Sequence, residues 1–256
     1  MGKGPPPRKP SHGPAGVSLD LEGRVALVTG ASRGIGAAVA RRLFEAGTDG
    51  AAAERVAAGV RSLGRRAICV GGDVGDPEVS EALARETEDS LGPVDVLVSN
   101  AGIAPPQGLE EITVEDWGRV TGVNLRPAFL LARRLTPGMR ERGWGRVVLV
   151  SSVAAFTGGI VGPHYTASKA ALVGLARALA VPLAPHGVTV NAVAPALIEG
   201  GETLPGDADS RSELARRVPV GRLGRPEEVA GAVHALVTNP YVTAQTFSVD
   251  GGMHPR

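Results

Sequence analysis

The chain has 256 residues, a length that suits one α/β domain or at most two small ones. Its 27 Lys and Arg side chains nearly balance its 26 Asp and Glu side chains, which leaves a net charge of +1. This balance disfavours electrostatic capture of nucleic acid or of an anionic membrane, so we expect neither partner. The only cysteine, Cys69, excludes an internal disulfide and fits a reducing, cytoplasmic compartment.

The N-terminal segment, residues 1–20, is rich in Pro, Gly and basic residues, and we predict that it is a disordered tail. It lacks the apolar core of a secretory signal. No uninterrupted apolar run of about 18 residues occurs, so the sequence predicts no transmembrane helix. Residues 21–256 contain no internal repeat and no linker, and we expect them to form a single domain.

From residue 24 onward, apolar runs typical of strands alternate with amphipathic runs typical of helices. In chain order the pattern predicts a strand at 24–29, helices at 35–46 and 55–63, a strand at 67–70, a helix at 78–90, a strand at 94–99, a helix at 114–135, a strand at 146–151, a helix at 165–183, a strand at 189–193, a helix at 227–237 and a strand at 245–249. Such alternation indicates an α/β fold, with a doubly wound parallel sheet of the Rossmann type. Pro182 is expected to kink or end the 165–183 helix.

A glycine-rich turn lies between the first strand and the first helix. It reads Thr29-Gly30-Ala31-Ser32-Arg33-Gly34-Ile35-Gly36. Glycines let the backbone approach phosphates closely, and the helix N-terminus supplies free N–H groups and a positive dipole end. The turn therefore predicts a pyrophosphate site, although a glycine-rich loop without a ligand is the alternative that this motif leaves open.

A second motif places Tyr165 four residues before Lys169, so the two side chains share a helix face. A free tyrosine has a pKa of about 10, which is too high for a good base at neutral pH. A neighbouring cation favours the phenolate and lowers that pKa. Such pairs also arise by chance on surface helices, so the motif gains its meaning from the rest of the chain.

The spacing TGxxxGIG of the glycine turn, taken with the Tyr165–Lys169 pair, resembles the classical short-chain dehydrogenase/reductase family. The likeness covers residues 20–254, and within the family it is strongest to 3-oxoacyl-carrier-protein reductases and broad ketoreductases. It implies an oxidoreductase that transfers a hydride between NADP(H) or NAD(H) and a carbonyl or secondary alcohol. It also implies a small-molecule substrate, a cytoplasmic homotetramer and no metal.

The same resemblance implies four catalytic residues. Tyr165 would be the acid/base, and Lys169 would lower its pKa and bind the nicotinamide ribose. Ser152, thirteen residues before Tyr165, would hold the substrate oxygen; we prefer it over its neighbour Ser151 on spacing alone. Asn124 would help hold a water that connects Lys169 to solvent.

The cofactor contacts implied by the resemblance come from five segments of the chain. They are Gly30, Ser32, Arg33, Gly34, Ile35, Gly36, Asp73, Val74, Asn100, Ala101, Gly102, Tyr165, Lys169, Pro195 and Ile198. Ala196 stands where the family usually has a glycine, so the backbone path there is expected to differ.

The chain departs from the family after the first helix, where a second strand should follow. Only Thr48–Gly50 separate the end of that helix from Ala51–Ala53, which favours helix over strand. The sequence therefore predicts that the second strand is missing or irregular. A deletion, a segment absent from the sequence and an irregular path are all open.

That departure hides the residue that chooses between NAD and NADP. Arg33 is the remaining indication: a cation beside the ribose suits a 2′-phosphate, so we favour NADP(H) over NAD(H), with a merely solvated Arg33 as the alternative. The alternative function is a non-catalytic subunit or binding module with this fold and an impaired cofactor site. Cofactor binding separates the two.

Two segments are expected to set substrate identity, Val153–His164 and Glu199–Val220, and the glycines of the second suggest a mobile lid. His164 precedes Tyr165, and we expect its ring to line the pocket or to be exposed rather than to act as a base.

Overall fold

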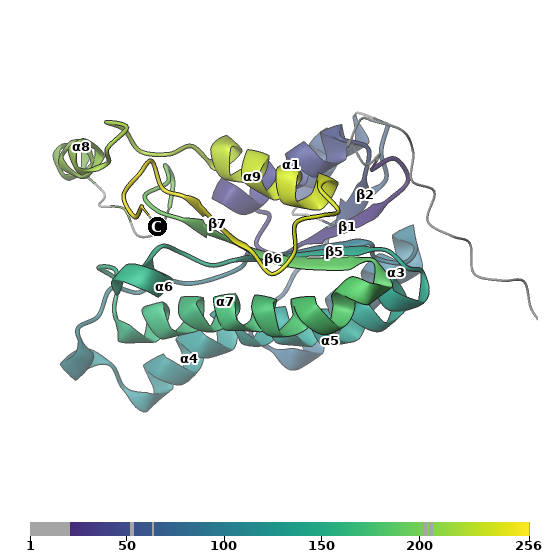
Figure 1. Ribbon diagram of the computed structural model, residues 1–256, viewed down its shortest axis with the longest axis horizontal. Helices are drawn as coiled ribbons and strands as arrows, with labels where there is room; N and C mark the ends of the chain where they lie inside the picture. Colours follow the sequence, from purple (N-terminus) through teal and green to yellow (C-terminus); the bar gives the residue numbers. More distant parts are fainter. Residues whose placement is uncertain (1–20, 52–53, 63, 202–203, 205–206, 256) are drawn as a thin grey trace, which may run out of the picture.

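The computed structural model describes residues 21–255, except 52–53, 63, 202–203 and 205–206, so the predicted tail lies outside the described residues. Seven parallel strands form one sheet in the order β3-β2-β1-β4-β5-β6-β7, which confirms the predicted fold (Figure 1). The strands are β1 Val25–Val28, β2 Asp49–Ala51, β3 Ala67–Ile68, β4 Val96–Ser99, β5 Gly145–Val150, β6 Val188–Pro195 and β7 Thr246–Val249.

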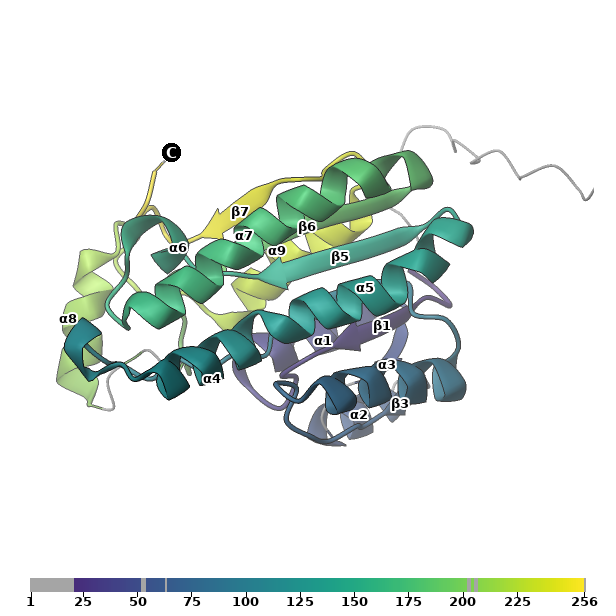
Figure 2. The same cartoon turned by 90° about the horizontal axis from the view of Figure 1, so that it is seen from below.

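Helices cover both faces of the sheet, as Figures 1 and 2 show. The described helices are α1 Gly34–Glu45, α2 Glu54–Arg61, α3 Pro77–Leu91, α4 Val114–Asn124, α5 Arg126–Glu141, α6 Ala154–Thr157, α7 Pro163–Leu183, α8 Ala208–Arg217 and α9 Pro226–Thr238, with short 3-10 turns η1 Leu109–Glu111 and η2 Ala184–His186. Helices α1, α2 and α9 pack on one face, and α3, α5 and α7 pack on the other. Helices α6 and α8 both lie at the same end of the molecule (Figure 2).

The core has two halves, one on each side of the sheet. Successive strand residues point to opposite faces. Ala26 and Val28 of β1 therefore pack with α1, α2 and α9, whereas Val25 and Leu27 pack with α3, α5 and α7. Strands covered on both faces must be apolar on both, which explains the uninterrupted aliphatic runs in the sequence.

The second strand is present but short. The three residues of β2 pair in parallel with both β1 and β3. At its centre, a Cβ on Gly50 would lie 2.2 Å from the Ala26 carbonyl oxygen and 2.5 Å from Phe44 Cε1, so only glycine fits. The prediction of an irregular second strand is therefore confirmed, and the alternative that the strand is missing is wrong. The sequence has no aliphatic run here, and β2 is instead held by the close approach of its backbone at Gly50 to the backbone of β1. Ala51, which the sequence assigned to a helix, is the last residue of this strand.

Two helical features differ from the sequence expectation, and one agrees with it. The helix predicted at 114–135 is two helices, because the chain breaks at Leu125 before Pro127, which has no N–H to continue α4. Helix α8 was not predicted; Asp207 caps it by accepting a hydrogen bond of 2.7 Å from the Ser210 N–H. Helix α7 ends at Leu183, directly after Pro182, as expected.

Among the described helices, one is long and apolar enough to cross a membrane by length and composition alone. It is the continuous run Pro163–His186, with a mean hydropathy of 1.4. Its buried side packs against β5 and β6 and carries Lys169 in the protein interior. These contacts make α7 a central helix of the α/β layers.

We expect Gly50→Val to lower the free energy of unfolding by about 1–3 kcal/mol or more, because the added side chain meets the backbone of β1 and the ring of Phe44. Urea denaturation measures this. Gly59→Ala on α2 is the matched control, since nothing lies within 4 Å of its added Cβ; it should leave stability unchanged or raise it by about 0.5–1 kcal/mol. An unchanged midpoint for Gly50→Val would contradict the packing described for β2.

Candidate active site

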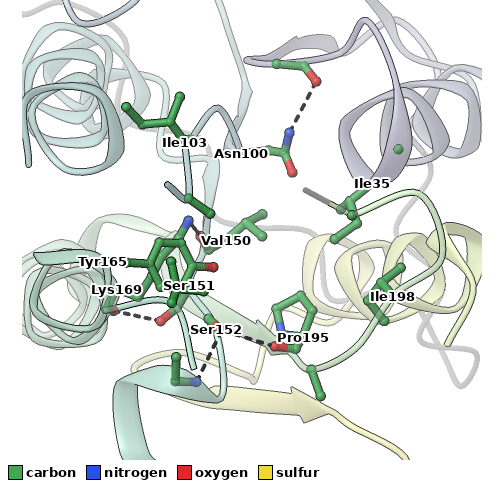
Figure 3. A pocket seen from close by; sticks show the side chains of 18 of the residues that line it. Ile35, Asn100, Ile103, Val150, Ser151, Ser152, Tyr165, Lys169, Pro195 and Ile198 are labelled. Atoms are coloured by element: carbon green, nitrogen blue, oxygen red, sulfur yellow. Dashed lines mark hydrogen bonds between the residues drawn. The ribbon is translucent and has the colours of Figure 1, made fainter. Parts of the chain in front are cut away.

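A cavity of about 590 Å³ lies at the carboxyl ends of β1, β4, β5 and β6 (Figure 3). The strand order reverses between β1 and β4, and such a switch point is where open α/β sheets bind ligands. Most of the residues implicated from the sequence line this cavity. They are Gly30, Ser32, Arg33, Gly34, Ile35, Asp73, Val74, Asn100, Ala101, Gly102, Ser152, Tyr165, Lys169, Pro195 and Ile198.

The glycine turn forms one end of the cavity. Gly30 and Gly34 have φ angles of 66° and 54°, which favour glycine. A Cβ on Gly36 would lie 2.3 Å from the Gly30 carbonyl oxygen, so Gly36 supports the turn from behind. The side chain of Arg33, the N-cap residue, makes no capping hydrogen bond to the first turn of α1. A helix N-terminus that its N-cap side chain leaves uncapped, next to a turn where a side chain would not fit, suits a pyrophosphate.

Asn100 ties the ends of β4 and β1 together. Its side-chain amide donates to the Thr29 carbonyl oxygen at 3.1 Å and to the Gly30 carbonyl oxygen at 3.3 Å. The Thr29 hydroxyl oxygen accepts from the backbone N–H groups of Asn100 and Ala101, both at 3.0 Å. The four hydrogen bonds hold the two strand ends at the spacing that opens the cavity between them.

Asp73 and Val74 line the wall of the cavity beyond β3. One carboxylate oxygen of Asp73 accepts a hydrogen bond of 2.9 Å from the Gly75 N–H, so Asp73 also holds a local turn. Asp73 therefore both stabilises this turn and lines the cavity.

Tyr165 and Lys169 lie on the first turns of α7, with the Lys169 ammonium 5.7 Å from the centre of the Tyr165 ring. The ammonium donates a 2.9 Å hydrogen bond to the Val150 carbonyl oxygen at the end of β5. Lys169 is only 4% exposed, and this burial lowers its pKa to about 8. A proton on Lys169 is therefore held less tightly than on a solvated lysine.

Ser151 and Ser152 have different environments. The buried Ser151 hydroxyl donates to the Lys169 carbonyl oxygen at 2.7 Å, which fixes the start of α7 against β5. The Ser152 hydroxyl is half-buried; it accepts from the Ala154 N–H at 3.2 Å and has only a long contact of 3.5 Å to the Pro195 carbonyl oxygen. The hydrogen bond that Ser152 donates is therefore much longer than the one that Ser151 donates, so the Ser152 proton is the easier of the two to redirect to a ligand (Figure 3).

Asn124 does not line the cavity; it lies behind its wall at the end of α4. Its side chain accepts from the Ile103 N–H at 2.8 Å and donates to the Ile103 carbonyl oxygen and the Ser168 hydroxyl, both at 3.0 Å. A Cβ on Gly102 would lie 3.2 Å from Asn124 Oδ1 and 3.3 Å from Lys169 Nζ. Gly102 therefore packs against both side chains.

The opposite side of the cavity is formed by Pro195 and Ile198, with Ile35 beside them (Figure 3). Ala196 does not have a positive φ angle, and its N–H donates to the Val249 carbonyl oxygen at 3.1 Å. The backbone therefore accommodates the side chain of Ala196 without strain, although the family usually has glycine there.

Leu214 and Arg217 of α8 line the cavity from within Glu199–Val220, a segment that the sequence predicts to set substrate identity. Met253 of the C-terminal segment also lines the cavity, and no sequence motif implicated it. That segment is held in place by His254, whose ring stacks on Phe156 of α6 with centroids 5.8 Å apart. No local pattern signals the contact of Met253, because it depends on how distant segments fold together.

Two further expectations concern His164 and the binding of a metal ion. His164 was expected to line the pocket or to be exposed, and that expectation is wrong: the ring is fully buried and does not line the cavity. Among the described residues, no group of three or more His, Cys, Asp or Glu side chains is placed to hold a metal ion.

Comparison with known proteins agrees with this geometry. The family profile described as short chain dehydrogenase matches residues 24–205. The chain is 39% identical over 243 residues to the 3-oxoacyl-(acyl-carrier-protein) reductase FabG of Vibrio cholerae, covering 92% of this chain and 99% of that protein. It is 38% identical over 247 residues to the L-rhamnose 1-dehydrogenase (NAD(P)(+)) of a Sphingomonas species, covering 91% and 97%.

Among solved structures, the 3-oxoacyl-(acyl-carrier protein) reductase of Brucella melitensis superposes with a TM-score of 0.84 at 34% identity, covering 94% of this chain and 97% of that chain. The fold, the cavity and these matches together place the chain in the short-chain dehydrogenase family. It is an oxidoreductase of that family, close to the FabG-type ketoreductases.

The buried ammonium predicts a pH dependence of stability. In the unfolded chain the Lys169 ammonium has the ordinary lysine pKa of 10.5, whereas burial in the folded protein lowers this pKa to about 8. Between these values the unfolded state binds more protons, so the free energy of unfolding should rise with pH, by about 1–3 kcal/mol. Urea denaturation at pH 7 to 10 of the wild type and Lys169→Met isolates this contribution. Parallel curves for the two proteins would contradict it.

Proposed function

We propose that the protein is an NADP(H)-dependent reductase of 3-oxoacyl or similar ketone substrates. The observation that supports this most directly is the convergence of Tyr165, Lys169 and Ser152 on one cavity that also contains the glycine turn. The alternative of a non-catalytic binding module depended on a missing second strand, and β2 occupies that place in the sheet.

In the direction of reduction, Tyr165 donates its phenolic proton to the carbonyl oxygen of the substrate. The Ser152 hydroxyl donates a hydrogen bond to the same oxygen, which holds it within reach of the phenol. A bound nicotinamide supplies the hydride that the carbonyl carbon receives. The product is a secondary alcohol, and the Tyr165 phenolate must then be reprotonated.

Lys169 serves that reprotonation in two ways. Its cation favours the phenolate of Tyr165, and its pKa of about 8 lets it exchange a proton near neutral pH. Asn124 positions the wall beside Lys169 through Ile103 and Gly102, and we assign it the outer part of the proton path.

The cofactor preference rests on Arg33. Its side chain is exposed and lines the cavity at the N-terminus of α1, where a cation suits the 2′-phosphate of NADP(H). The glycine turn with Ser32, Gly34 and Ile35 would hold the pyrophosphate, and Asp73 with Val74 would contact the adenine.

We further propose that the protein works in the cytoplasm as a homotetramer. Trp117 of α4 and Phe129 of α5 are 44% and 46% exposed, and Phe247 of the edge strand β7 is 37% exposed. Helices and an edge strand with exposed aromatic rings are suitable for contacts between copies. Sedimentation velocity tests this, and a monomer mass at micromolar concentration would overturn it.

Tyr165→Phe should reduce kcat by at least about 10²–10⁴-fold, because the variant keeps the ring but cannot donate a proton. Ketone reduction followed by loss of NADPH absorbance measures kcat, and calorimetric titration with NADPH shows whether the cavity is intact. Turnover within a small factor of the wild type would remove Tyr165 from the proposed chemistry.

Cofactor binding gives the most direct test of the nucleotide preference. NADPH at about 100 times its Kd should stabilise the fold by roughly 2.7 kcal/mol, which raises the Tm. We expect Arg33→Ala to weaken NADPH binding while leaving NADH binding unchanged. Arg41→Ala, an exposed cation further along α1, is the matched control and should change neither. A larger Tm shift with NADH than with NADPH in the wild type would reverse the assignment.

A further inference from the structure

His164 is a buried polar residue that the proposed chemistry does not use. Its ring is fully buried, one residue before Tyr165 at the start of α7. Nε2 lies 3.0 Å from Gln107 Oε1, whereas Nδ1 has no hydrogen-bond partner among the described residues. An amide oxygen can only accept, so the imidazole carries its proton on Nε2 and donates it to Gln107.

Gln107 joins two loops of the cavity wall. Besides the side-chain contact to His164, its backbone N–H donates to the Val161 carbonyl oxygen at 2.9 Å. The loop that contains Gln107 contributes Ile103 and Ala104 to the cavity, and the loop before α7 contributes Ile160 and Val161. These two hydrogen bonds therefore hold together two walls of the cavity beside Tyr165.

The same glutamine connects to the start of α4. Asp116 accepts hydrogen bonds from the Thr113 N–H at 3.1 Å and the Thr113 hydroxyl at 2.7 Å, which forms the N-terminal cap of α4. The Thr113 contacts are the main cause of the lowered pKa of this carboxyl, and the neighbouring Gln107 side chain adds to it. The Gln107 side chain thus contacts the ring of His164 and also influences the carboxyl that caps α4.

The two loops are closely packed where Gln107 meets His164. Gly162, between the Val161 carbonyl and His164, has a φ angle of 146°. A Cβ at Gly162 would lie 2.5 Å from the Gln107 carbonyl oxygen and 2.9 Å from His164 Cε1. The backbone of one loop is therefore in direct contact with the other loop and with the imidazole.

We propose that Gln107 and His164 form a positioning pair, which locks the two loops around the reacting end of the cavity and so sets substrate binding. His164 acts through Gln107 and through the first turn of α7, not on the substrate, because its ring does not reach the cavity. This inference rests on the proposed ketone reduction for its kinetic consequence, but the loop contact can be measured without turnover.

The decisive variants differ in where they place a donor. In His164→Gln, the side-chain amide nitrogen occupies the ε position and can still donate to Gln107 Oε1. In His164→Asn, the amide reaches only the δ position, and in Gln107→Met the acceptor is lost. Gln245→Met is the matched control, because it removes one exposed hydrogen bond of 3.2 Å far from the two loops.

The first readout is hydrogen–deuterium exchange followed by mass spectrometry, which needs no activity. We expect faster exchange in residues 101–112 and 158–162 of His164→Asn and Gln107→Met, and wild-type exchange in His164→Gln and Gln245→Met. The glycine turn at 29–36 should be unchanged in all four. Wild-type exchange of both loops in His164→Asn and Gln107→Met, or equal acceleration in His164→Gln, would overturn the proposal.

The second readout is the kinetics of ethyl acetoacetate reduction with NADPH. We expect His164→Asn and Gln107→Met to raise the KM for the ketone about tenfold, which corresponds to about 1.4 kcal/mol, with the Kd for NADPH within about twofold of the wild type. His164→Gln should restore the KM. The double variant should be no worse than either single variant, since both remove one contact. A KM and an NADPH Kd that rise together would show a merely structural role.

The two proposals fail separately. A wild-type protein that shows no turnover with ketones, yet shows the expected exchange pattern, would refute the proposed function and leave the loop contact established. Normal turnover with unchanged loop exchange in the variants would refute the positioning pair alone.

Discussion

The hydrogen bonds between Thr29 and Asn100 are the constraint on which the rest of the site depends. In a parallel sheet, the strand pair at the switch point diverges at its carboxyl end, because the following helices leave toward opposite faces. Here the Asn100 amide and the Thr29 hydroxyl fix that divergence with four contacts. Gly36 packs directly on the Asn100 amide, so the same side chain also sets the height of α1 above the cavity.

The sequence predicted most of the fold, because strands covered on both faces leave long aliphatic runs that are easy to recognise. It predicted the second strand only as missing or irregular, because Asp49–Ala51 owes its place to backbone approach at Gly50 and not to apolar side chains. The break at Leu125 was overlooked for a different reason: Pro127 interrupts the helical hydrogen bonds within a pattern whose apolar period continues. Secondary-structure propensity and apolar periodicity describe side chains, whereas the short strand β2 and the helix break at Leu125 both depend on the backbone.

For the candidate site, spacing in the sequence located the residues that follow strands or lie on one helix face, such as Tyr165 and Lys169. In the sequence, the number of residues before Tyr165 was the only basis for preferring Ser152 over Ser151. The structure adds a physical difference, because the Ser151 hydroxyl donates a hydrogen bond to the backbone of α7. The sequence placed Arg217 only within a predicted substrate segment, Glu199–Val220, and it could not locate Met253, which reaches the cavity from the C-terminal segment. It also misjudged His164, because burial of a polar ring depends on a partner 57 residues away in the chain.

The stacking of His254 on Phe156 has a practical consequence for work with this protein. Because Met253 belongs to the cavity wall, a peptide fused to the C-terminus begins only a few residues along the chain from that wall. A purification tag at that end would compete with ligands for the same space and disturb the ring stack that holds the segment down. A tag at the N-terminus would instead be far along the chain from Met253. Preparations that differ only in the end chosen for the tag would therefore differ in how they report substrate affinity.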